Sequence, residues 1–194
     1  MGSCSSLGAK RRNFNDAGRV CPVDYRIEPA AFHGTPATHC ETLYVVGGLY
    51  GNLFALAALK ERVARETRPT HVVLNGDIHW FDREPSDFAA LEQGVESFEV
   101  LAGNVELELR RKVDVGVGCG CSYPDCTSDA DVSRSNRIHA ILSTMIADQP
   151  ALKRQLEGRE VVTTASVGGV RVAITHGDET LVGGWGCSRE SLQD

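Results

Sequence analysis

The chain has 194 residues, of which 42% are hydrophobic and 24% charged, the composition of a globular protein with a sizeable core. Its formal net charge is −6 and it has no long run of Lys or Arg, so we expect no nucleic-acid partner. No apolar run approaches the roughly 20 residues that span a membrane, so we expect no membrane partner either.

The N-terminal segment and the cysteines set expectations for the setting of the protein. Seven is an odd number of cysteines, and residues 1–20 lack the apolar segment of a secretory signal, so we expect free thiols in a cytoplasmic protein. The polar composition of residues 1–20 predicts a mobile tail, followed by a single domain over residues 21–194. Gly2 and Cys4 fit a short pattern for N-myristoylation and palmitoylation, which also arises by chance.

The first half of the domain predicts alternating strands and helices. Residues 21–40 contain three prolines and predict a loop with one short turn. Apolar runs predict strands at 42–47, 71–75 and 97–102, and helical periodicity predicts helices at 53–66, at 86–96 and after residue 104. This alternation is typical of right-handed βαβ units, so we expect an α/β fold with a mostly parallel sheet.

The second half is expected to be less regular. Residues 113–131 predict a long connection with several glycines and cysteines, followed by helices at 131–147 and 151–157. Two apolar segments, 160–166 and 170–175, flank a pair of glycines and predict a β-hairpin.

A glycine-rich turn follows the first predicted strand. Residues 47–52 have the sequence GGLYGN, in which Asn52 suits a helix N-cap. Backbone N–H groups at such a turn attract anions, so we assign Gly48, Gly51 and Asn52 to phosphate binding. A βα turn that needs positive φ explains the same glycines without a ligand.

Polar residues stand beside glycines at three further strand ends: Asp77, Asn104 and His176. Ligands of open α/β sheets bind beyond the C-terminal ends of the strands, so we expect these side chains to meet. A carboxylate, an amide oxygen and an imidazole would suit one Mn²⁺, Fe²⁺ or Zn²⁺ ion, which would bind phosphate oxygens and lower the pKa of a bound water. Alternatively, Asp77 caps its loop, Asn104 is a helix N-cap and His176 is a hydrogen-bonded turn residue.

Four short motifs follow one another in a distinctive order. They are Gly51-Asn52-Leu53-Phe54-Ala55-Leu56, Gly76-Asp77 through Asp82, Gly103-Asn104-Val105-Glu106, and His176-Gly177. This order resembles the calcineurin-like metallophosphoesterase superfamily. The resemblance implies a four-layer αββα sandwich and two metal ions bridged by Asp77, with Asn104 and His176 as ligands of the second ion. It also implies Asp77 and His176 as catalytic residues.

The chain departs from the pattern of that family at several points. Gly48 and Tyr50 stand where the family has an aspartate and a histidine, and Val105 stands where it has another histidine. The last family motif, G-H-T-H, does not occur before Asp194. The resemblance therefore implies a degenerate dinuclear site with one ion, and a second sheet that is incomplete.

Three nearby side chains are candidates to compensate for the missing ligands. His79 lies two residues after Asp77, and Asp178 lies two residues after His176. Tyr50 would donate a hydrogen bond to a phosphate oxygen. For His79, packing against its aromatic neighbours is the alternative.

The long connection contains a second candidate site. Cys119, Cys121 and Cys126 form a C-x-C-x₄-C run, with His139 further along the chain. These residues would bind zinc as a thiol cluster, although the spacing differs from that of C-x₂-C knuckles. Burial of small side chains in a tight loop is the preferred alternative, and a redox role is the third.

Two functions remain open at this point. The first is a metal-dependent phosphoester hydrolase that acts on a small phosphate-containing ligand. The second is a non-catalytic module on the same fold that binds phosphate, a nucleotide or another protein. An incomplete second sheet would expose an edge strand, so pairing of two copies as a homo-oligomer is a further expectation.

Overall fold

The computed structural model describes residues 17–189 and 191–192 of the chain. Most of the predicted mobile tail, including Gly2 and Cys4, lies outside these residues. The part that is described contacts the domain, because Asn136 Nδ2 donates to the Ala17 carbonyl over 2.8 Å and Gly18 N donates to the Val117 carbonyl over 2.9 Å. Residues 17–20 therefore belong to the folded domain.

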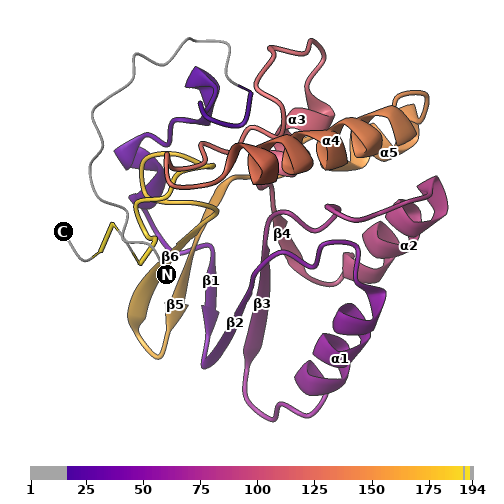
Figure 1. Cartoon of the computed structure of the whole chain (residues 1–194). Coiled ribbons are helices and arrows are strands. Elements are labelled where there is room, and N and C mark those ends of the chain that lie inside the picture. The colour runs from indigo at the N-terminus through magenta and orange to yellow at the C-terminus, as the bar shows by residue number, and fades with distance from the viewer. Residues whose placement is uncertain (1–16, 190, 193–194) are drawn as a thin grey trace.

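A parallel sheet carries the first half of the chain (Figure 1). Its strands, in spatial order, are β2 (Thr42–Val46), β3 (Thr70–Asn75) and β4 (Glu99–Leu101). The crossovers contain α1 (Leu53–Val63) and α2 (Pro85–Val95). The predicted βαβ units are confirmed, and the C-terminal ends of all three strands lie at the same edge of the sheet.

The two faces of this sheet are buried against different partners. Val72 and Leu74 of β3 pack with Leu56 of α1, in a cluster that also includes side chains of α2. Val73, which points to the opposite face, packs with Ile174 of a second sheet. Helices thus cover one face of the parallel sheet and the second sheet covers the other (Figure 1).

The second sheet combines a hairpin with a strand from the N-terminal region. Its strands, in spatial order, are β1 (Thr38–Cys40), β5 (Val162–Val167) and β6 (Val170–Thr175). Gly168 and Gly169 have φ of +56° and +87°, as the two-residue turn of a hairpin requires. The predicted hairpin is therefore confirmed, and β1 pairs in parallel with β5.

The segment before β2 is more ordered than a loop with one turn. It contains two 3₁₀ helices and β1, and the helices are η1 (Val23–Tyr25) and η2 (Pro29–Phe32). A strand of three residues is too short to show a hydrophobic period. Its hydrogen bonds come from β5, far along the chain.

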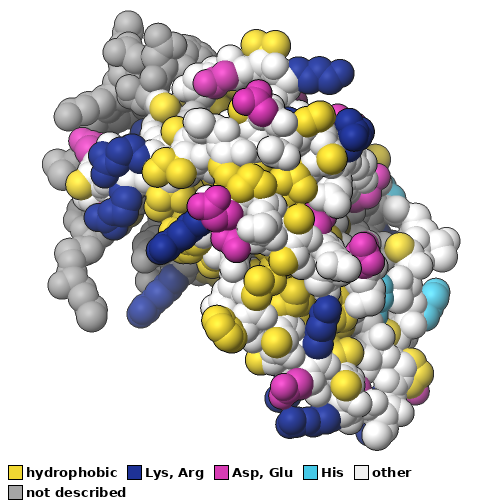
Figure 2. Space-filling model, turned by 90° about the vertical axis from the view of Figure 1, so that its right-hand side faces the viewer, with side chains coloured by type: hydrophobic (Ala, Val, Ile, Leu, Met, Phe, Trp, Pro, Cys, Tyr) yellow, Lys and Arg dark blue, Asp and Glu magenta, His cyan; other side chains and the backbone are white. Residues whose placement is uncertain are grey.

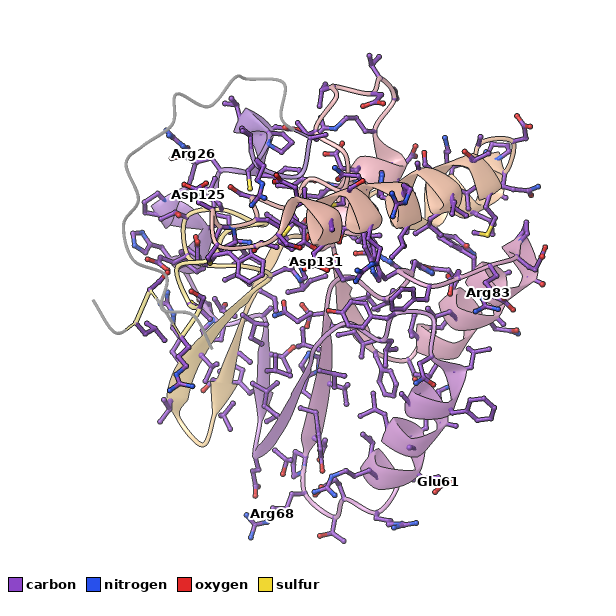
Figure 3. All side chains as sticks on the ribbon, viewed as in Figure 1. Arg26, Glu61, Arg68, Arg83, Asp125 and Asp131 are labelled. Atoms are coloured by element: carbon purple, nitrogen blue, oxygen red, sulfur yellow. The ribbon has the colours of Figure 1, made fainter. Side chains whose placement is uncertain are left out.

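Three helices complete the fold, and their bounds are α3 (Asn104–Arg110), α4 (Asp129–Met145) and α5 (Pro150–Leu156). Leu109, Leu142 and Leu156 join them in one apolar cluster. In Figure 3, Arg68 before β3 marks one end of the strands, and Asp131 of α4 lies toward the other end. Within the part of the chain that the structure describes, no helix has both the length and the apolar character to cross a membrane.

Candidate functional site

A pocket of about 400 Å³ opens beyond the C-terminal ends of the strands. Three of its lining residues form what we call the polar trio: Asp77, Asn104 and His176. Five others form what we call the aromatic rim: Tyr50, Trp80, Phe81, Tyr123 and Trp185. Asn104 is buried, as are the apolar lining residues Cys119 and Val182, whereas Tyr50, Phe81 and Trp185 are exposed, so the aromatic rim lies nearer the mouth of the pocket than Asn104 does.

Three strand ends bring the polar trio together, as the sequence predicted. Asp77 follows β3, Asn104 begins α3 after β4, and His176 follows β6. His176 Nε2 is 3.1 Å from Asn104 Oδ1 and 3.5 Å from Asp77 Oδ2. Asn104 is not the N-cap of α3, because Gly103 holds that position and the Asn104 side chain faces the pocket.

Two glycines permit this close approach. A Cβ on Gly76 would lie 2.4 Å from the Gly103 nitrogen, and a Cβ on Gly103 would lie 2.3 Å from Asp77 Oδ1. Any side chain at either position would displace the backbone or the carboxylate. These glycines therefore allow the ends of β3 and β4 to come close together, as the sequence indicated.

Glu106 fixes the turn that carries Asp77. Its fully buried carboxylate accepts hydrogen bonds of 2.7 Å, 2.9 Å and 2.9 Å from the backbone N–H groups of Asp77, Ile78 and Gly103. Asp77 has φ of 53°, a left-handed conformation that costs a non-glycine residue roughly 1–2 kcal/mol. The hydrogen bonds to Glu106 hold this turn in place. Sequence reasoning had given Glu106 no role at the site.

The polar trio brings three electron-rich atoms together. His176 Nδ1 donates to the Asn75 carbonyl over 2.6 Å, which leaves Nε2 facing the other two side chains. Asn104 Nδ2 donates to the Cys119 carbonyl over 2.8 Å, so Oδ1 is the Asn104 atom turned to the imidazole. An imidazole nitrogen and two acceptor oxygens at these distances need a proton or a cation between them.

In the free protein, a proton meets this need. Burial by itself would lower the pKa of His176, but the hydrogen bond to Asp77 and the charge of Asp77 raise that pKa to about 9. His176 therefore carries a proton at neutral pH. Binding of a cation at Nε2 would release that proton.

Strained backbone is concentrated at the pocket. Among the described residues, only Tyr50 and Asp77 combine a side chain with positive φ, and both line the pocket. The Tyr50 ring lies against Gly48, where an added Cβ would come within 2.6 Å of it. Residues held in unfavourable conformations cluster at ligand sites, which supports a binding role for this pocket.

Three N–H groups of the glycine loop, those of Tyr50, Gly51 and Asn52, donate to backbone carbonyls of the fold. Gly48, Gly51 and Asn52 are not among the residues that line the pocket. The Gly51 N–H donates to the Ile78 carbonyl over 2.6 Å, and the Asn52 side chain caps α1 by accepting from the Ala55 N–H over 2.9 Å. In this structure the loop shapes the position of Tyr50, which is the one candidate compensating group that the pocket contains.

The other two candidate compensating groups are not among the residues that line the pocket. His79 is fully buried, with Nδ1 2.6 Å from Asp82 Oδ2 and Nε2 2.5 Å from Glu92 Oε1, and its ring stacks on Phe88. Asp178 accepts three backbone N–H groups within residues 180–186 and so shapes the C-terminal loop. Both side chains thus have structural partners, and neither lines the pocket.

The structure separates the cysteine run. Cys119 and Cys121 line the pocket, whereas Cys126 is exposed and does not. Burial raises the pKa of Cys119 to about 11 and that of Cys121 to about 12, so both thiols are neutral at pH 7. Among the residues described, no three His, Cys, Asp or Glu side chains are grouped so as to hold a metal ion. Zinc binding by these cysteines stays a prediction.

The aromatic rim is the feature of the site that the sequence did not predict. Trp80 and Phe81 follow Asp77 in the loop after β3, Tyr123 lies in the long connection, and Trp185 lies in the C-terminal loop. No hydrophobic period links residues so far apart in the chain. Two adjacent aromatic residues just after Asp77 were the only local sign.

Comparison with protein-family models and with curated proteins gave no match for this chain. The chemistry of the pocket therefore has to follow from its own geometry. Its deep end can hold a cation between a carboxylate, an amide oxygen and an imidazole, and its mouth offers flat apolar surfaces. Such a pocket is suited to a ligand with one anionic end and one apolar end.

Proposed function

We propose that the chain is a degenerate member of the calcineurin-like metallophosphoesterase superfamily that hydrolyses a small phosphate ester with one divalent cation. The observation that carries the proposal is the convergence of Asp77, Asn104 and His176 at three strand ends. The order of the short motifs supports it. So does the packing of two sheets face to face with helices over the outer face of the parallel one, which corresponds to three of the four layers of an αββα sandwich.

The donor set of the polar trio fits one cation. A carboxylate, an amide oxygen and an imidazole nitrogen suit Mn²⁺, Fe²⁺ or Zn²⁺. The hydrogen bond from His176 Nδ1 to the Asn75 carbonyl is of the kind that orients imidazole ligands. When bound, the cation would stabilise negative charge on the phosphate oxygens in the transition state.

The residues of the chain would supply orientation and hydrogen bonds. Burial and then the charge of Asp77 raise the pKa of Tyr50, so its hydroxyl stays protonated and can donate to a phosphate oxygen. Asp77 is held by Glu106 and by the Val105 N–H, which donates to its Oδ1 over 3.1 Å. The polar trio is therefore preorganised, as catalysis by charge stabilisation requires.

A non-catalytic phosphate-binding module on the same fold is the second candidate function. It is favoured by the positions of His79 and Asp178, which have structural partners and do not replace the ligands that the resemblance lacks. The face shown in Figure 2 gives no sign of a large single-sign surface, since basic and acidic side chains both surround its central hydrophobic band. Under either function, we propose a small ligand in the pocket, and not a macromolecule on this face, as the partner.

Titration of the chelator-treated protein with Mn²⁺ tests the cation site. We expect one Mn²⁺ ion to bind per chain by isothermal calorimetry, with an affinity that falls by at least about tenfold in His176→Ala or Asn104→Ala. His33→Ala, which removes an exposed histidine outside the pocket, is the matched control and should bind as the parent does. If these variants bind Mn²⁺ equally, the assignment of the polar trio is wrong.

Turnover separates the two functions. Hydrolysis of 4-nitrophenyl phosphate that depends on Mn²⁺ and stops with chelator supports the enzyme. Binding of Mn²⁺ and inorganic phosphate without turnover supports the non-catalytic module. Absence of both binding and turnover would contradict both.

A further inference from the structure

The aromatic rim consists of two walls that come from different parts of the chain. Phe81 makes edge contacts with Tyr50 and Trp80, with ring centroids 6.1 Å and 6.3 Å apart. Tyr123 and Trp185 form the other wall, with centroids 5.7 Å apart and ring planes tilted by 42°. All five rings line the pocket that contains the polar trio.

Three of these five rings are exposed, while Trp80 and Tyr123 are half-buried. Phe81 is 56% exposed, Tyr50 is 45% exposed and Trp185 is 38% exposed. Single exposed apolar side chains are ordinary, but a group of them around one pocket marks a ligand surface. Flat aromatic surfaces are best covered by another flat ring, through stacked or edge contacts.

The polar trio and the aromatic rim occupy different parts of the pocket. Asn104 is 6% exposed at the deep end, where the polar trio would hold a cation and a phosphate group. The aromatic rim surrounds the mouth. A volume of about 400 Å³ is in the range of pockets for small organic ligands and leaves room for a phosphate group and a ring together.

Polar groups of the pocket lining favour a heteroaromatic ring over a plain hydrocarbon ring. The Cys121 thiol and the Gly183 backbone line the pocket, and the Tyr123 hydroxyl, which pairs with Ser135 Oγ over 2.9 Å, can both donate and accept and so has capacity for a second hydrogen bond. These groups can pair with nitrogen and oxygen atoms on a ring edge. A nucleobase has such edges and a face that stacks on aromatic side chains.

We propose that the pocket binds a mononucleotide, with its phosphate at the polar trio and its base against the aromatic rim. The phosphate end rests on the proposed function, whereas the base end rests on the rim alone. The base would stack on Phe81, the most exposed ring of the aromatic rim, and cover a surface that is otherwise in water. The substrate class of the site is therefore nucleoside monophosphates rather than phosphate esters of sugars alone.

The chain provides its own reporter for this binding. It has two tryptophans, Trp80 and Trp185, and both belong to the aromatic rim. Tryptophan emission, excited at the red edge of its absorption, should therefore report on the pocket. AMP and adenosine should both quench it in the presence of Mn²⁺, and calorimetry should give AMP an affinity at least about tenfold higher than ribose 5-phosphate.

Phe81→Leu tests the stacking surface with little change in apolar bulk. Phe81 is exposed, so the variant should fold as the parent does, which a thermal melt would check. We expect it to weaken AMP binding by about fivefold or more and to leave ribose 5-phosphate unchanged. Phe54→Leu, on α1 and 90% exposed, changes an aromatic residue outside the pocket and should affect neither ligand.

Each outcome bears on one end of the ligand. Equal affinities for AMP and ribose 5-phosphate, or AMP binding that Phe81→Leu leaves unchanged, would overturn the base assignment and leave the phosphatase proposal standing. Adenosine binding that Phe81→Leu weakens, without any gain from the phosphate of AMP, would support the base assignment and count against the phosphate end. No binding of either AMP or adenosine would overturn the inference.

Discussion

Asp77→Asn is expected to reduce Mn²⁺-dependent hydrolysis of 4-nitrophenyl phosphate by at least about a hundredfold. Asp77 supplies the carboxylate of the polar trio, so the change removes the negative charge that would hold the cation. Asparagine keeps the volume of the side chain and an oxygen that can accept from the Val105 N–H. It also tolerates the positive φ of this position. The variant should therefore stay folded while it loses kcat/KM, with a melting temperature lowered only by the loss of the ion pair with protonated His176.

A matched change separates this effect from a general loss of acidic charge. Asp148→Asn removes an exposed carboxylate outside the pocket and should leave turnover unchanged. Retention of activity in Asp77→Asn would remove Asp77 from the catalytic site. Loss of activity together with an early melting transition would instead point to a damaged fold, and circular dichroism would detect that case.

Glu106→Gln is expected to lower the free energy of unfolding by about 3 kcal/mol. The Glu106 carboxylate accepts three backbone N–H groups in a fully buried setting, and hydrogen bonds to a charged acceptor are the strong ones. A glutamine would turn an NH₂ group toward some of these donors and leave them without an acceptor. Urea unfolding measures the loss, which corresponds to a decrease of about 10 °C in Tm for a chain of this size.

The control for this change is Glu61→Gln, on the exposed surface of α1 (Figure 3). Glu61 makes an exposed ion pair of 3.7 Å with Arg65, and such pairs contribute little. A similar loss of stability in both variants would show that the buried hydrogen bonds of Glu106 have no special weight. Weaker Mn²⁺ binding in Glu106→Gln at a temperature where it stays folded would show that the turn at Asp77 also depends on them.

Local patterns predicted the regular part of this fold and the meeting of the polar trio. The helical periods, the paired glycines of the hairpin and the glycines beside Asp77 and Asn104 are all encoded over a few residues. The convergence of Asp77 and Asn104 then follows from a general property of parallel sheets, whose C-terminal strand ends share an edge. His176 follows β6 of the second sheet, so its place beside them depends on how the two sheets pack.

Features that depend on distant partners could not be predicted in the same way. β1 has only three residues and exists because Thr38 pairs with Ala165 of β5. The roles of His79 and Asp178 depended on the direction in which each side chain points, which spacing along the sequence does not give. After the positive φ of Asp77, His79 lies between Asp82 and Glu92 and not in the pocket.

Asn75 links the two sheets by hydrogen bonds beside the pocket. Its Nδ2 donates to the Thr175 carbonyl over 2.9 Å, and its own carbonyl accepts from His176 Nδ1. One residue of β3 is thus fastened to both the end of β6 and the imidazole beyond it. His176 belongs to the second sheet and Asp77 to the parallel sheet, so a shift between the two sheets would separate the imidazole from the carboxylate before any helix unfolds. Ligand affinity should therefore fall before the helical content does when the packing of the sheets is disturbed.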